Sequence, residues 1–171
     1  MATTTTFDGK TYFQAIATSL KDIANSGTGN HFTKITGLGK MEGFLAERHS
    51  LTGYQLVYMD FMRGRYIDNK SDNILNQRFH TFFVMKNAAD SLYDGKGEAA
   101  VDDCMAVARK IISKMREDRR NYANLMERLD VSSISFEQVG PIAQGWHGVN
   151  VSFFMIDNPG DILYDATDWT E

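Results

Sequence analysis

One stretch decides how this chain folds: Gly97–Leu129, which reads GEAAVDDCMAVARKIISKMREDRRNYANLMERL. After its first residue it holds no glycine and no proline, the two residues that cost a helix most. Acidic residues crowd its first turn and basic residues its later turns, an order that suits the helix dipole. Its apolar residues recur at steps of three and four and so share one helical face: Val101, Cys104, Met105, Ala108, Ile111, Ile112 and Met115. We therefore predict a long amphipathic helix that needs a flat apolar partner.

The charged run Arg116–Arg120 is expected to end the buried part of this helix. Because Glu117 and Asp118 lie inside the run, we interpret it as a solvated face rather than a phosphate-binding cluster. The apolar spacing then resumes, as a continuation or as a second short helix, at Tyr122, Leu125, Met126 and Leu129.

The segments before this stretch begin with a second amphipathic pattern. Thr11–Ala24 has helical spacing, with Asp8 as its N-cap, and a polar, glycine-containing run stops it. Phe32–Thr36 predicts a short strand. Three glycines make the segment from Gly37 to Gly43 loop-like, with room for a helical turn at Glu42–Arg48.

Two strands are expected between the helices, at Tyr54–Tyr66 and at Gln77–Met85. Both are apolar on both faces, and the polar segment Ile67–Asn76 between them predicts a long exposed hairpin tip. A strand that is apolar on both faces must be covered on both. The helices can cover one face, and we expect neighbouring subunits to cover the other.

Two cleaner strands follow the long helix, at Ser132–Val139 and His147–Asp157, with Gly140, Pro141 and Gly145 marking their connection. The order of elements predicts an α+β fold with a mainly antiparallel sheet and two helices packed on one face. We expect a single domain over residues 1–157 with a flexible N-terminal arm at 1–8. Residues 158–171 form a tail with four acids and no base.

Composition narrows the functional classes. The chain has 171 residues and a net charge of −4, so no global basic field points to nucleic acid. Its single cysteine, Cys104, fits a reducing compartment and a buried position. No apolar run approaches the roughly 20 residues of a membrane helix, and the N-terminus lacks the apolar core of a signal peptide.

No motif for catalysis, metal binding or cofactor binding stands out. The four histidines lack metal-ligand spacing, and we expect surface or interface roles for His31, His49, His80 and His147. Asp60 interrupts an apolar strand and is expected to form an ion pair with Arg63, Arg65 or Arg78. The glycine-rich pieces match no phosphate loop, and no nucleophile elbow is present. We predict no catalytic, metal or cofactor site and no enzymatic activity.

The order of elements from Thr11 to Asp157 resembles the tail terminator and tail-completion proteins of tailed bacteriophages, the family of the lambda tail terminator. Two phrases also resemble the closing strand pair of such proteins, especially those of phages and prophages of Bacteroides-like bacteria. They are Ser135-Phe-Glu-Gln-Val-Gly-Pro-Ile142 and Gly145-Trp-His-Gly148-Val-Asn-Val-Ser-Phe153. The chain departs from the simplest members in its acidic tail and in its glycine-rich segment at Gly27–Gly43.

The resemblance implies a structural virion protein that forms a ring, with a hexamer as one option, at the head–tail junction. Such a ring terminates or completes the tail, contacts neighbouring neck and tail proteins, and meets DNA at most in its lumen. It would be assembled in the cytoplasm of the bacterial host, without a membrane partner or a cofactor. The residue pattern agrees on one point, since two-faced strands and an apolar-acidic tail suit a subunit covered by copies of itself.

Two alternatives stay open: another head–tail adaptor or tail tube subunit, and a small cytoplasmic ligand-binding or enzyme domain whose two-faced sheet lines a pocket. Under the first reading the interface residues share a place on the two-faced strands, the hairpin tip or the tail. They are Phe61, Arg63, Arg65, Ile67, Lys70, Ile74, Leu75, Arg78, Phe83, Ile162, Leu163, Tyr164 and Trp169.

Overall fold

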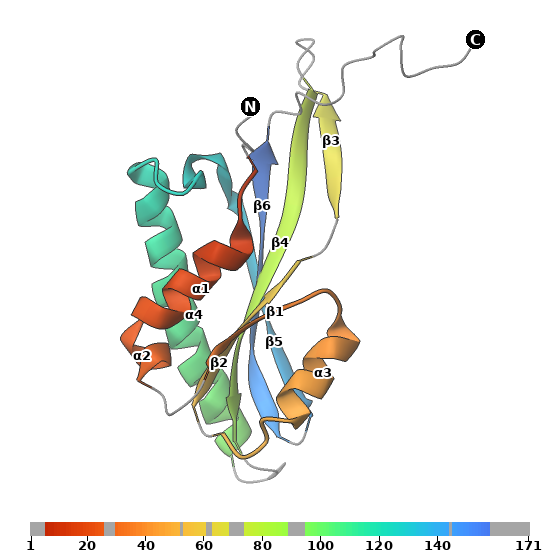
Figure 1. The fold of residues 1–171 in the computed structure, drawn as a ribbon, viewed down its shortest axis with the longest axis vertical. Helices are drawn as coiled ribbons and strands as arrows, with labels where there is room; N and C mark the ends of the chain where they lie inside the picture. The colour runs from red at the N-terminus through yellow and green to blue at the C-terminus, as the bar shows by residue number, and fades with distance from the viewer. Residues whose placement is uncertain are drawn as a thin grey trace, which may run out of the picture.

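The computed structural model describes residues 6–25, 30–51, 53–60, 63–68, 74–88, 95–143 and 145–157. Over these residues the fold is α+β, as predicted, with a mixed six-stranded sheet and helices on both of its faces (Figure 1). In chain order the elements are α1 (Gly9–Ser19), α2 (Lys21–Ala24), β1 (Phe32–Ile35), α3 (Leu38–Ala46), β2 (Tyr54–Met59), β3 (Gly64–Asp68), β4 (Ile74–Asn87), α4 (Lys96–Arg120), a 3-10 helix (Met126–Arg128), β5 (Leu129–Ile142) and β6 (Trp146–Asp157).

The strand order is β1-β2-β4-β6-β5, and β3 also pairs with β4. β4 and β6 are the long central strands of the sheet. Their register runs from Asn76 opposite Asp157 to Asn87 opposite Trp146. All described pairings are antiparallel except β1 with β2, which is parallel. The sheet is therefore mixed and mainly antiparallel. The prediction of two helices on one face is not exact, because α1, α2 and α4 pack on one face and α3 packs on the other.

The strand predicted at Tyr54–Tyr66 is two strands along one edge of β4. Met59 lies opposite Thr81 and Gly64 opposite Arg78, so five residue steps on the outer chain face three on β4. A two-residue insertion thus separates β2 from β3. The predicted hairpin tip is also too long, because Ile67 pairs with Leu75 inside the β3–β4 ladder. Only residues 69–73, which lie outside the described residues, connect the two strands.

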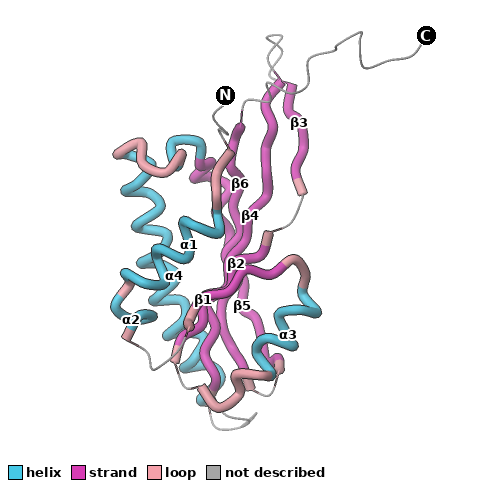
Figure 2. The backbone as a smooth tube through the Cα atoms, viewed as in Figure 1, coloured by secondary structure: helices cyan, strands magenta, loops and turns pink. Residues whose placement is uncertain are grey.

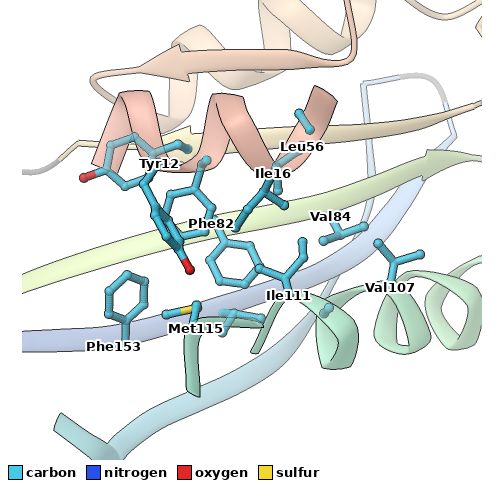
Figure 3. Packing of buried hydrophobic residues seen from close by; sticks show 14 of the residues in the cluster. Tyr12, Ile16, Leu56, Phe82, Val84, Val107, Ile111, Met115 and Phe153 are labelled. Carbon is cyan, nitrogen blue, oxygen red and sulfur yellow. The ribbon is translucent and has the colours of Figure 1, made fainter. Parts of the chain in front are cut away.

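The larger core lies between the sheet and α1, α2 and α4 (Figure 3). Ile111 and Met115 of α4 pack in this core with Phe82 and Phe153 of the sheet, as the helical spacing predicted. Cys104 of α4 is buried in the same core, with its Sγ 3.9 Å from the carbonyl oxygen of His147 in β6. Asp8 caps α1, since its Oδ1 accepts a hydrogen bond of 3.1 Å from the backbone N–H of Thr11. The first predicted helix is broken at Leu20, whose backbone is extended. The long helix ends at Arg120, and the resumed spacing beyond it becomes the 3-10 helix and the start of β5.

A smaller core lies on the opposite face of the sheet, under α3. Val57, Phe83 and Met85 pack there against Leu45 and against Trp146, whose indole N–H donates a 2.9 Å hydrogen bond to the Leu45 carbonyl. The expectation that other subunits cover this face is therefore wrong at this end of the sheet. So is the loop expected at Gly37–Gly43, which lies largely within α3. Burial of Met41 and Leu45 offsets the helix cost of two glycines, roughly 1 kcal/mol each.

The end of the predicted N-terminal arm belongs to the domain. Phe7 is buried, and its ring stands edge-on to His80 with the centroids 5.3 Å apart. Residues 1–5 and the tail 158–171 lie outside the described residues.

Candidate interaction surface

The sheet extends well beyond α3. Figure 2 shows β3 and the adjoining ends of β4 and β6 continuing past that helix. On the face turned away from α1 and α4, these strands place a group of apolar side chains that are only half-buried. The register brings Phe79 opposite Phe154 and Leu75 opposite Ile67, while Ile156 lies opposite Gln77. Phe79 and Phe154 meet edge to face, with ring centroids 5.6 Å apart.

Two exposed arginines lie over this apolar group. The Arg63 guanidinium carbon is 5.3 Å from the centre of the Phe79 ring, and that of Arg65 is 5.9 Å from the Phe154 ring. Arg65 is also held by a 2.7 Å hydrogen bond from its Nε to Oε1 of Gln77. Contacts of this kind stabilise exposed sites by only about 0.5–1 kcal/mol each. We call the set Arg63, Arg65, Ile67, Leu75, Phe79, Phe154 and Ile156 the arginine–aromatic surface.

A groove of about 420 Å³ lies between this surface and α3. Its floor includes Thr81, Asn150 and Ser152, which are tied together and to Glu137 by hydrogen bonds. Asn150 Nδ2 donates to Glu137 Oε1 at 2.8 Å, and Ser152 Oγ donates to Thr81 Oγ1 at 3.2 Å. Apolar side chains such as Met59 and Phe83 line its wall. The groove can accept a small, largely apolar group with a few hydrogen-bonding atoms.

Four residues predicted from the sequence as interface residues meet on the arginine–aromatic surface: Arg63, Arg65, Ile67 and Leu75. Arg78 does not, because it lies opposite Met155, a residue of the larger core, and so points to the other face. Phe83 is 4% exposed and packs within the smaller core of its own chain. Ile74 lies in β4 opposite Asp68, and its side chain is not described. The others lie outside the described residues: Phe61, Lys70, Ile162, Leu163, Tyr164 and Trp169.

Sequence reasoning missed Phe79, Phe154 and Ile156 as members of this surface. Phe154 and Ile156 do interrupt the polar face of their strand, which is a signal that this face is not simply solvated. What the sequence could not supply is the β4–β6 register, which alone places Phe154 beside Phe79.

Two histidines contradict the expectation of surface or interface roles, because His31 and His80 are both buried. His80 Nδ1 lies 2.8 Å from the Tyr58 hydroxyl, and its ring stacks on Phe153. Burial lowers the pKa of His80 to about 4, with help from the positive charge of Arg78 and against the charge of Asp60. The imidazole is therefore neutral at pH 7 and acts as part of the core.

Two carboxylates, of buried Asp118 and of partly exposed Asp60, have partners within the chain. Asp118 is 3% exposed, accepts a 2.9 Å hydrogen bond from the Tyr12 hydroxyl and pairs with Lys114. Burial, and then the Asp118 carboxylate, raise the pKa of Tyr12. Asp60 forms its ion pair with Lys34 of β1, at 2.5 Å, instead of with the arginines that we predicted. Such internal pairing is typical of groups that hold a fold together.

Within the described residues, no group of three or more His, Cys, Asp or Glu side chains could hold a metal ion. None of the helices described is long and apolar enough to cross a membrane. No protein-family model matches the sequence, and a search of curated proteins finds no match.

Proposed function

We propose that this protein is a structural subunit of a tailed-bacteriophage virion that assembles as a ring at the head–tail junction and terminates or completes the tail. One observation carries the proposal: an arginine–aromatic surface that the chain leaves half-exposed. Aromatic residues and arginine are enriched at protein–protein contacts. The resemblance in element order adds to this, with β1 and α3 as additions to the simplest pattern.

In such a particle the protein acts by binding rather than by catalysis. Copies of the chain would form the ring, neighbouring neck and tail proteins would contact its two ends, and DNA would at most pass through the lumen. The predicted interface residues Arg63, Arg65, Ile67 and Leu75 already share one face, which is the arrangement that a contact needs. No cofactor or membrane enters the proposal.

Electron microscopy and sedimentation of the purified protein test the ring. We expect a closed particle with an open lumen and a mass that is a multiple of the 19.3 kDa chain. Phe154→Glu should weaken the particle because it places a charge in the centre of the arginine–aromatic surface. Tyr122→Glu is the matched control, since Tyr122 is 79% exposed and belongs to the turn after α4. A monomer at every concentration would contradict the proposal.

The groove beside α3 favours a second candidate, a small ligand-binding domain. Its volume of about 420 Å³ lies within the range of small-molecule sites. Thermal-shift measurements with a panel of small apolar and amphipathic compounds test this. A compound that raises the melting temperature of the wild-type protein, but not of Asn150→Leu, would favour the ligand-binding function.

A further inference from the structure

Among the described strands, three are paired on one side only: β1 with β2, β3 with β4 and β5 with β6. β3 and β5 differ from β1 because each carries a run of consecutive exposed residues. These are residues 64–66 of β3, together with Arg63 just before it, and residues 135–138 in the middle of β5. A strand with an unpaired side presents backbone N–H and C=O groups that can bind another strand.

Each edge carries one large aromatic side chain that is unusually exposed. Tyr66 and Phe136 are both 61% exposed. Both point to the side of the sheet that carries α1 and α4, because Tyr66 lies opposite Asn76, in step with Phe82, and Phe136 opposite Val151. Phe82 and Val151 belong to the larger core on that side. Tyr66 and Phe136 therefore lie on the same face of the sheet, at the opposite edges formed by β3 and β5.

The two edges also carry opposite charges on the other face. Arg65 of β3 lies opposite Gln77, and Glu137 of β5 lies opposite Asn150, so both point away from α1 and α4. Both side chains are exposed. Their present hydrogen bonds, to Gln77 and from Asn150, are to neutral groups of their own chain.

We propose that β3 of one copy pairs with β5 of the next copy in an antiparallel ladder, with Arg65 opposite Glu137 and Tyr66 opposite Phe136. The direction follows from the sheet: β3, β4, β6 and β5 alternate in direction, so β3 and β5 are antiparallel, and extending the sheet in the same orientation keeps them so. In an antiparallel ladder opposite residues share a face. One register therefore satisfies the charge pair and the aromatic pair together.

This contact joins two different surfaces, so it is heterologous, and repetition closes into a ring or continues as a filament. The inference rests on the proposed ring and deepens it by naming the strands that join the copies. In this arrangement a second copy of the chain binds the unpaired side of β3.

Disulfide trapping tests the register in a Cys104→Ala background, which removes the native thiol. Opposite Cα atoms in an antiparallel ladder lie about 4.5–5.5 Å apart, inside the range that a disulfide spans. Tyr66→Cys mixed with Phe136→Cys should give a disulfide-linked dimer on mild oxidation, and a chain with both substitutions should give a ladder of multimers. Tyr66→Cys mixed with Tyr122→Cys is the control and should give little product. A dominant Tyr66→Cys homodimer would overturn the heterologous pairing.

Charge exchange tests the same register without a covalent bond. Arg65→Glu and Glu137→Arg should each weaken assembly by about tenfold, because each places like charges opposite one another. The two substitutions together should restore assembly, and circular dichroism should show an unchanged fold in all three variants. If both charge variants assemble normally while deletion of residues 158–171 abolishes assembly, the contact between copies depends on the tail and not on the β3 and β5 edges. That result would overturn this inference.

The outcomes separate this inference from the proposed function. A wild-type ring that survives both charge reversals and gives no mixed disulfide would overturn the edge pairing and leave the ring proposal standing. A wild-type monomer would overturn both.

Discussion

His80 shows how burial changes the chemistry of a single residue in this fold. Its imidazole lies between the Phe7 and Phe153 rings and meets the Tyr58 hydroxyl, away from water. A histidine in a strand would ordinarily titrate near pH 6.5. Here burial lowers its pKa to about 4, so the folded protein holds the neutral form through the physiological range.

The lowered pKa of His80 predicts a loss of stability in acid. Below about pH 6.5 the unfolded chain binds a proton at this residue, while the folded chain binds it only near pH 4. The free energy of unfolding should therefore fall by up to about 3 kcal/mol between these two values. In His80→Gln, which keeps a hydrogen-bonding partner for Tyr58, this fall should be smaller. Urea unfolding of both proteins at a series of pH values measures the difference, and parallel curves would contradict it.

Cys104 lies fully buried on the apolar face of α4, as its place in the helical pattern predicted. Burial raises the pKa of its thiol to about 12, so the reactive thiolate is scarcely populated. Cys104→Ala should lower the free energy of unfolding by about 1–3 kcal/mol, the cost of a small core truncation, and leave assembly unchanged. Urea unfolding and sedimentation measure the two effects. Loss of function in a folded Cys104→Ala protein would instead indicate a chemical role for the thiol.

At the scale of elements, periodicity predicted α1, α4 and β6, whose burial is one-sided or alternates. It also predicted β5, from the alternation of Ile134 and Phe136 with polar residues, although residues 135–138 of this strand are all exposed. α3 was missed because its glycines resemble a loop, and only contact with Trp146 and the sheet shows why it is helical. The insertion between β2 and β3 was missed because apolar residues continue through it, and only strand pairing shows the break.

The same limit applies to the candidate surface. The sequence predicted four of its members because they flank a hairpin: Arg63, Arg65, Ile67 and Leu75. They lie on one face because the two strands of this hairpin, β3 and β4, pair with each other. Arg78 and Phe83 come from the same hairpin but face buried structure. Arg78 lies opposite a residue of β6, and Phe83 packs in the smaller core under α3. Both elements are distant in sequence from the hairpin, so no local pattern predicts these contacts.

Because Phe83 is buried in the smaller core, a substitution there should affect folding and not assembly alone. Phe83→Asp should prevent folding, because an unpaired charge buried between the sheet and α3 costs several kcal/mol. The matched variant is Phe136→Asp, which changes a 61% exposed side chain and should leave the fold intact. Circular dichroism and thermal unfolding compare the two proteins. A folded, soluble Phe83→Asp protein would contradict the placement of Phe83 in the smaller core.

At the scale of the whole molecule, the described sheet is paired out to Asp157. This residue is the last of β6, is 7% exposed and accepts a 2.9 Å hydrogen bond from Arg128 in an ion pair. Its strand is paired out to that position with Asn76 of β4. A chain that stops at residue 157 therefore keeps this ion pair and this strand pairing.

The tail, residues 158–171, is predicted to dock on a neighbouring chain. Exposure to water is unfavourable for its large apolar side chains, which are those of Ile162, Leu163, Tyr164 and Trp169. Its aspartates favour contact with solvent, and they are Asp161, Asp165 and Asp168. Deletion of 158–171 should leave the circular dichroism spectrum of the domain unchanged, yet weaken assembly in sedimentation or prevent joining to a partner. Replacing the three aspartates with asparagine separates charge from apolar contact, because only a contact that depends on charge should then weaken. If the truncated protein forms the same particle as the full chain, the tail takes no part in assembly.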